Sequence, residues 1–125
     1  MDVTDSILFL EYPKCSTCQK AKKWLDGHGV RYEARNIVER NPTADELRAW
    51  HERSGLPLKR FFNTSGMLYR EMELSKKLPA MSEAEQYDLL ASNGMLVKRP
   101  LLVTPDTAIP GFKEPAWRSA LNLCP

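Results

Sequence analysis

The pattern of hydrophobic and polar positions predicts a strand, a helix and a second strand at the start of the chain. Residues 7–10 read ILFL, a continuous apolar run that ends before Pro13 and is typical of a strand buried on both faces. In residues 17–28, apolar side chains recur at helical spacing between lysines, and two glycines provide the end. Apolar and charged residues then alternate over residues 30–37, as in a half-buried strand. The order is that of the start of a βαβ unit.

Two later segments carry the pattern of a capped helix start, a Ser or Thr followed three residues later by Glu. Thr43 and Glu46 precede one helix with an apolar face. Ser82 and Glu85 precede another, which the pair at residues 93–94, Asn-Gly, is expected to end. Both helices are therefore predicted from local capping chemistry.

The rest of the chain predicts short helices and a second pair of strands. Residues 56–81 are broken by prolines and a glycine, and we interpret them as loop with short helices. Residues 101–104 and 107–109 form two short strands around a Pro-Asp turn. A last helix begins at Pro115 and has apolar residues at helical spacing: Trp117, Ala120, Leu121 and Cys124. The order β-α-β, helices, β-β-α predicts a mixed α/β fold.

Composition narrows the class of protein. The chain has 125 residues, enough for one domain with its own core, and no repeat or linker divides it. Its net charge of +2 does not indicate a nucleic-acid partner. No stretch approaches the roughly 18 apolar residues of a membrane span, and the first residues lack the features of a secretory signal. We expect a cytoplasmic monomer without membrane contact.

Two cysteines three positions apart, Cys15 and Cys18, are the main candidates for chemistry. A zinc site is one interpretation, but it needs four ligands. The other candidates, Cys124, His28 and His51, do not form a second pair, so no metal site is predicted. A second interpretation is that both cysteines are small packing residues. Three cysteines, two of them close neighbours, suit a reducing compartment better than a secreted disulfide framework.

The position of the pair favours redox chemistry. Cys15 lies at the turn out of the buried strand, and Cys18 lies in the first helical turn, where free N–H groups and the helix dipole favour a negative sulfur. Lys14 and Lys20 add positive charge nearby. Cys15 is the predicted nucleophile, because a thiolate is the attacking species. Cys18 is the predicted resolving cysteine, since it can attack a mixed disulfide formed at Cys15.

Four segments resemble one known family over nearly the whole chain: YPKCSTCQKAKKWLDGHGV, FFNTSGMLYRE, LLASNGMLVKRPLLV and GFKEPAW. They are similar to the arsenate reductase-related family that also contains the Spx and MgsR proteins. The resemblance implies one domain over residues 1–125, with a thioredoxin-like core. It also implies a helical insertion at about residues 40–95, between the β-α-β and β-β-α halves.

The resemblance also implies roles for individual residues. Cys15 matches the nucleophile of the glutaredoxin-coupled arsenate reductases, Arg99 matches the arginine that faces it, and Pro100 matches a cis proline. A guanidinium suits this place because it offers paired donors to an oxyanion and stabilises a thiolate. The catalytic set is therefore Cys15, Cys18 and Arg99. The expected substrate-binding set is Lys14, Ser16, Thr17, Asn63, Ser65 and Pro100.

Two positions depart from the arsenate reductases, which hold their anion with further arginines. This chain has Ser65 and Gly111 in the corresponding regions, and the candidates to replace the missing arginines are Lys59, Arg60 and Lys113. Cys18 is a third departure, because a cysteine at this position is a feature of the Spx and MgsR branch. Arsenate reduction is therefore doubtful as the activity of this chain.

Two functions remain open from the sequence. The first is a thiol-disulfide oxidoreductase that acts on a small oxidised substrate. It would have no bound cofactor, and glutathione or a glutaredoxin- or thioredoxin-type protein would serve as its reductant. The second is a redox-sensing regulator which, like Spx, binds the α subunit of RNA polymerase. Oxidation-dependent partner binding distinguishes the second from the first.

Overall fold

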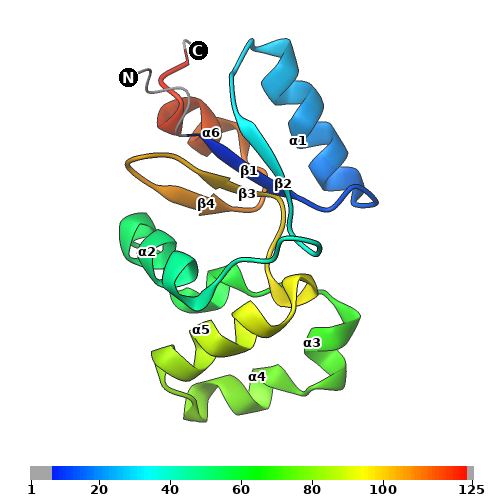
Figure 1. Cartoon of the computed structure of the whole chain (residues 1–125), viewed down its shortest axis with the longest axis vertical. Helices are drawn as coiled ribbons and strands as arrows, with labels where there is room; N and C mark the ends of the chain where they lie inside the picture. The colour runs from blue at the N-terminus through cyan, green and yellow to red at the C-terminus, as the bar shows by residue number, and fades with distance from the viewer. Residues whose placement is uncertain (1–6, 124–125) are drawn as a thin grey trace.

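A four-stranded sheet forms the upper part of the molecule (Figure 1). The computed structural model describes residues 7–123. The strands lie in the order β2-β1-β3-β4. Their bounds are β1 Leu8–Glu11, β2 Glu33–Asn36, β3 Leu101–Val103 and β4 Ala108–Pro110. β1 pairs with β2 in parallel, whereas β3 is antiparallel to both β1 and β4, so the predicted βαβ start and the predicted strand pair are both confirmed.

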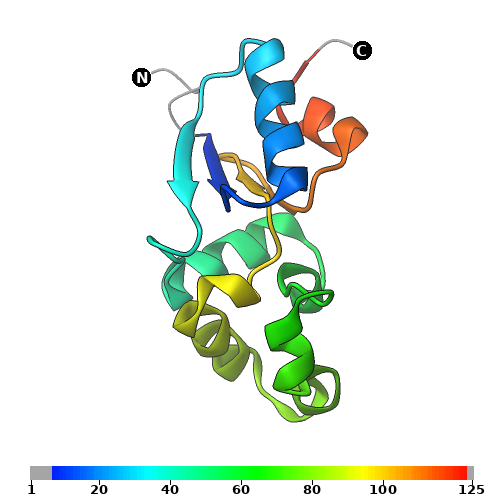
Figure 2. The same ribbon diagram turned by 90° about the vertical axis from the view of Figure 1, so that its right-hand side faces the viewer.

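Two helices cover one face of the sheet, and the others form a helical half at its other side (Figures 1 and 2). The covering helices are α1 Ser16–Gly27 and α6 Glu114–Ala120. The helical half contains α2 Ala44–Ser54, α3 Met67–Glu71, α4 Leu74–Lys77 and α5 Glu83–Ser92. It also contains three short 3₁₀ helices: η2 Leu58–Phe61, η3 Leu78–Ala80 and η4 Gly94–Leu96. The architecture is therefore the predicted mixed α/β fold.

The two faces of the sheet belong to two separate hydrophobic clusters. Phe9 and Leu102 point toward α1 and α6 and pack with Trp117. Leu10 and Leu101 point the other way, into the larger cluster that the helical half completes. Successive side chains of a strand point to opposite faces. The continuous apolar run in β1 therefore supplies buried side chains to both faces of the sheet, as the sequence predicts.

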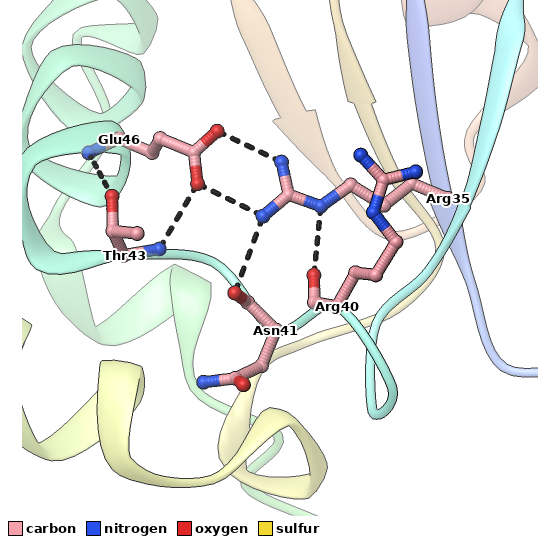
Figure 3. A network of polar contacts seen from close by, with 5 residues as sticks. All are labelled: Arg35, Arg40, Asn41, Thr43 and Glu46. Carbon is pink, nitrogen blue, oxygen red and sulfur yellow. Dashed lines mark hydrogen bonds and ion pairs between the residues drawn. The ribbon is translucent and has the colours of Figure 1, made fainter.

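A polar network joins the end of β2 to the start of α2 (Figure 3). Glu46 and Thr43 form the predicted capping box, in which the Glu46 N–H donates to Oγ1 of Thr43 and the Thr43 N–H donates to the Glu46 carboxylate. The guanidinium of Arg35 donates to both Glu46 oxygens and to the backbone carbonyls of Arg40 and Asn41. The connection between the sheet and α2 is therefore held by side chains as well as by packing.

Close packing explains the glycine at the end of α5. The helix ends at Ser92, as predicted, but Asn93 has φ −159°, which is extended rather than left-handed. A Cβ atom at Gly94 would collide with the backbone carbonyl of Ile37. Gly94 is therefore required by the contact between this segment and the residue after β2.

Two element boundaries and the burial of one residue differ from the sequence expectation. β2 begins at Glu33 rather than at residue 30, because Glu33 pairs with Leu8, the first residue of β1, and a strand starts only where a partner is available. Ala34, expected on the inward face, is exposed on this edge strand. The last helix ends at Ala120 instead of continuing along the predicted apolar face. Cys124, at the end of that face, lies outside the described residues.

Candidate functional site

Cys15 occupies the N-cap position of α1. Its backbone is extended, with φ −88° and ψ 120°, and its N–H donates to the carbonyl of Tyr12 at 2.9 Å. Its Sγ accepts the backbone N–H of Cys18 at 3.4 Å. The N–H groups of a first helical turn have no partner within the helix and carry partial positive charge. The sulfur of Cys15 therefore lies at the end of α1 toward which these N–H groups point.

Cys18 lies one turn further on and is buried. Burial raises the pKa of its thiol to about 12; the hydrogen bond and charge of Cys15 raise it as well, whereas the Tyr12 N–H and the Arg99 charge lower it. That Tyr12 N–H donates to Sγ of Cys18 at 3.5 Å. Cys18 therefore carries its proton at neutral pH.

The two thiols differ in access. Both are free in the structure rather than joined in a disulfide. Cys15 is partly exposed at the helix start, whereas Cys18 is buried behind it. A partly exposed sulfur that accepts a backbone N–H suits attack, and a buried protonated sulfur suits a later step. The roles of nucleophile and resolving cysteine remain predictions, and this asymmetry is their physical basis.

Arg99 is held close to this pair by backbone carbonyls and an aromatic ring. Its Nη1 donates to the carbonyls of Met95 at 3.2 Å and Val97 at 3.4 Å. Its Cζ lies 5.4 Å from the centre of the Tyr12 ring, and its Nε is buried without a hydrogen-bond partner among the described residues. The Arg99–Pro100 peptide bond is cis, as the resemblance implies.

Two cavities meet at Arg99. One, here called the basic pocket, has a volume of about 420 Å³ and is lined by Thr17, Arg60, Lys98, Arg99, Lys113 and residues 110–112. The other has a volume of about 530 Å³, and Asn63, Ser65 and Met67 lie among its lining residues. The structure therefore brings Thr17 to one side of Arg99, and Asn63 and Ser65 to the other.

The remaining predicted residues lie in different places. Lys14 and Ser16 are exposed near the start of α1, and Pro100 is buried. Of the candidates to replace the missing arginines, Arg60 and Lys113 both line the basic pocket. Lys59 lines two other cavities, formed by the helical half and its connections.

Two residues of the site were missed by the sequence analysis. Tyr12 supplies both the N–H that reaches Cys18 and the ring beneath Arg99. Lys98 lines the basic pocket. The available signals in the sequence were that Tyr12 lies directly before the cysteine loop and that Lys98 lies directly before Arg99. Neither position reveals on its own that the side chain or N–H points to the site.

The histidines have structural contacts. His28 follows α1 as its C-cap, and its Nδ1 lies 2.7 Å from the carbonyl of Trp24. Nδ1 of His51 lies 2.6 Å from the hydroxyl of Tyr87 in the helical half. Within residues 7–123, no group of three or more His, Cys, Asp or Glu side chains is placed to hold a metal ion. In the same range, no helix is long and apolar enough to cross a membrane.

A sequence model of the ArsC family matches residues 10–120 of this chain. The chain belongs to the ArsC family. It is 56% identical to the uncharacterised protein YusI of Bacillus subtilis, over 109 residues that cover 87% of this chain and 92% of YusI. It is 26% identical to the regulatory protein MgsR of the same organism, over 85% of this chain and 82% of MgsR.

Solved structures of ArsC relatives share the fold. An ArsC family related protein from Bacteroides fragilis has a TM-score of 0.90 and 56% identity, with 94% of this chain and 98% of that chain covered. A possible arsenate reductase from Streptococcus mutans has a TM-score of 0.82 and 48% identity, with coverage of 87% and 92%. The thioredoxin-like fold with inserted helices, implied by the resemblance, is therefore confirmed.

Proposed function

We propose that this ArsC-family protein is a thiol-disulfide oxidoreductase in which Cys15 attacks the substrate and Cys18 resolves the mixed disulfide. The observation that carries the proposal is the arrangement at the start of α1. Sγ of Cys15 caps the helix by accepting the Cys18 N–H, and the buried Cys18 thiol stays protonated behind it. A helix start that stabilises one thiolate and a second thiol one turn away are the parts that disulfide exchange needs.

The reaction conserves sulfur, electrons and protons. The Cys15 thiolate attacks one sulfur of a substrate disulfide, so a Cys15–sulfur bond forms and the substrate S–S bond breaks. The departing half leaves as a thiolate and takes a proton from solvent. Cys18 then loses its proton and attacks Cys15, which releases the second half as a thiol. The substrate gains two electrons, and the protein is left with a Cys15–Cys18 disulfide.

A thiol reductant must return the oxidised protein to its starting state. Glutathione, or a glutaredoxin- or thioredoxin-type protein, is the proposed donor, because each supplies a thiolate that can attack a disulfide. Cys15 is the sulfur open to that attack, since it is partly exposed and Cys18 is buried. No bound cofactor takes part in this cycle.

The experiment that tests the proposal is a redox titration of the wild-type protein in glutathione buffers, read by mass spectrometry. An internal disulfide with a potential of about −200 to −300 mV is expected, in the range of cytosolic thiol couples. Cys18→Ser should instead accumulate a glutathione adduct at Cys15, and Cys15→Ser should form neither product. Failure of the two thiols to pair in the wild-type protein would remove the resolving role of Cys18.

A turnover assay is the second test of the proposed function. A wild-type protein supplied with a reductant should reduce small disulfides catalytically, and Cys15→Ser should lose this activity. Equal turnover by Cys15→Ser would contradict the assignment of the nucleophile.

A redox-sensing regulator is the second candidate. The 26% identity to the regulatory protein MgsR, over most of both chains, favours it, as does the pair of cysteines itself. In this case the disulfide would change the affinity for a partner, and the proposed partner is the α subunit of RNA polymerase. Co-purification with that subunit, measured with oxidised and reduced protein, tests it. Binding that is absent in both states would exclude this role.

Arsenate reduction is the narrower version of the enzyme proposal. Ser65 and Gly111 each line one of the cavities at Arg99, and neither can supply the charge of an arginine. Arsenate-dependent consumption of reductant, lost in Cys15→Ser, would establish the activity. Its absence, together with turnover of disulfides, would leave the general proposal intact.

A further inference from the structure

The basic pocket gathers four positive side chains around one cavity. Arg60, Lys98, Arg99 and Lys113 all line it, and the lining contains no acidic residue. Within residues 7–123, none of the four forms an ion pair with a carboxylate. Like charges around a cavity repel one another, and an anion between them relieves that repulsion. The pocket is therefore built for negative charge.

The size of the pocket indicates an extended anion. A volume of about 420 Å³ lies within the range of about 300–1,000 Å³ that is typical of sites for organic ligands. A single tetrahedral oxyanion fills only a small part of such a space. The cations also come from three separate segments of the chain, around Arg60, around Lys98 and around Lys113. This arrangement suits several carboxylates held apart by an organic skeleton.

The Lys98 side chain passes close to Gly111. A Cβ atom there would lie 3.5 Å from Cε of Lys98, so the stem of the lysine passes directly over the glycine. The backbone of Gly111 has φ +85°, a conformation that other residues rarely adopt. The Lys98 side chain therefore extends beside Gly111 in the lining of the same pocket.

The pocket adjoins the thiol pair. Thr17, in its lining, follows Cys15 by two residues in the first turn of α1. Arg99, also in the lining, lies over the ring of Tyr12, whose N–H donates to Sγ of Cys18. A molecule in the pocket is thus next to the helix start that Cys15 caps.

We propose that the basic pocket selects disulfide substrates that carry two or more carboxylates near the S–S bond. This inference rests on the proposed disulfide exchange. The carboxylates bind the ammonium and guanidinium groups and hold the S–S bond beside Cys15. Cys15 attacks one sulfur and keeps that half of the substrate, and the other half leaves as a thiolate that takes its proton from solvent.

The test compares three dialkyl disulfides of similar length and different charge. 3,3′-Dithiodipropionate carries two carboxylates, bis(2-hydroxyethyl) disulfide is neutral, and cystamine carries two ammonium groups. Their rates of adduct formation at Cys15 are measured by quenching and mass spectrometry in the Cys18→Ser background, where the adduct accumulates. Each rate is divided by the rate at which the same disulfide reacts with 2-mercaptoethanol. This division corrects for the intrinsic reactivity of the disulfide.

The dicarboxylate is expected to react at least about 10-fold faster than the neutral disulfide, and cystamine more slowly than both. Added salt should reduce the difference, because it screens the charges. Arg60→Gln with Lys113→Gln should bring the ratio of the dicarboxylate rate to the neutral-disulfide rate close to one. Lys23→Gln removes a single positive charge from the exposed side of α1 and should keep the preference, as should Arg60→Lys.

Equal corrected rates for the three disulfides would overturn the inference, and so would a preference that survives in the double variant. Reaction of none of the three at Cys15 would instead contradict the proposed exchange function. In that case the pocket is tested through suberate, the unreactive analogue of 3,3′-dithiodipropionate with two methylenes in place of the sulfurs. Suberate binding is measured by NMR. Binding to the wild-type protein that is lost in the double variant supports the selection of dicarboxylates, and an absence of binding excludes it.

Discussion

Arg35 and Glu46 form a two-pronged ion pair between the end of β2 and the first turn of α2. Nη1 of Arg35 lies 2.8 Å from one carboxylate oxygen of Glu46, and Nη2 lies 2.9 Å from the other. The Arg35 side chain is 11% exposed and that of Glu46 is 35% exposed. The same carboxylate completes the capping box with Thr43. One glutamate thus stabilises both the helix start and its attachment to the sheet.

Glu46→Gln is expected to destabilise the protein at neutral pH and much less in acid. The hydrogen bonds from Arg35 lower the pKa of Glu46, against the opposing effect of burial. A carboxyl group with a lowered folded pKa contributes stability above its unfolded pKa of about 4.3 and loses it as the pH falls through the folded value. We expect a loss of about 1 kcal/mol at pH 7, after allowance for solvent screening. Urea unfolding between pH 7 and pH 3 measures it.

Glu85→Gln is the matched control. Glu85 occupies the same capping-box position in α5 and receives the N–H of Ser82, but it has no arginine partner among the described residues. Its replacement should cost less stability than that of Glu46. An equal cost would assign the effect to the capping box and not to Arg35.

Gly94→Ala is expected to destabilise the protein by at least about 2 kcal/mol, as overpacking of a rigid site does. The new Cβ would meet the backbone carbonyl of Ile37, which cannot move without disturbing the end of β2. Gly27→Ala, at the last residue of α1, meets open space and should leave stability unchanged or higher. Thermal unfolding of both variants checks the difference, and a neutral Gly94→Ala would show that this contact can relax.

Closure of the internal disulfide is expected to accelerate with pH across the neutral range. Burial is the largest cause that raises the pKa of Cys18 to about 12, and it persists when Cys15 is in a mixed disulfide. Only the thiolate attacks, so its fraction and the closure rate should rise by about tenfold per pH unit below that pKa. Quenched mass spectrometry of a preformed Cys15 adduct between pH 6 and pH 9 measures the rate. A plateau near pH 7 would contradict the assignment.

Arg99→Met is expected to slow the same closure step. Burial dominates the pKa of Cys18, and the positive charge of Arg99 is among the influences that lower it. Without that charge the thiolate fraction at a given pH falls, and we expect closure to be roughly threefold slower. Lys98→Met removes a neighbouring charge that lines the basic pocket and should leave the closure rate closer to that of wild type. A larger effect from Lys98 than from Arg99 would refute this role for Arg99.

Local signals predicted most of the secondary structure. Both capping boxes are present, at Thr43 and Ser82, because each depends on residues three positions apart. β1 and α1 lie within one residue of their predicted ranges. The errors fall at β2 and α6, where the boundary depends on a partner strand or on packing. The broken segment from 56 to 81 does contain short helices, as expected.

The candidate site was predictable in its cysteines, in Arg99 and in the candidate cations Arg60 and Lys113, but not in Lys98. The CxxC spacing and the helix start identify Cys15 and Cys18 directly. Lys98 was not predicted as a site residue, because a lysine next to an arginine on the chain is usually solvated. Its role depends on Gly111 and Lys113, which reach the same pocket from a different segment.

The sequence by itself determined which segments are helices and strands and where two helices begin. It also determined that Cys15 lies at a helix start and that Cys18 lies in the first turn of that helix. These properties depend on hydrogen bonds and apolar spacing between near neighbours. Only the tertiary structure decided the order of the strands, the burial that keeps Cys18 protonated, the contact of Gly94 with Ile37 and the gathering of four cations beside the thiols. These depend on distances between residues far apart in the chain, which are set by packing of the sheet against the helical half.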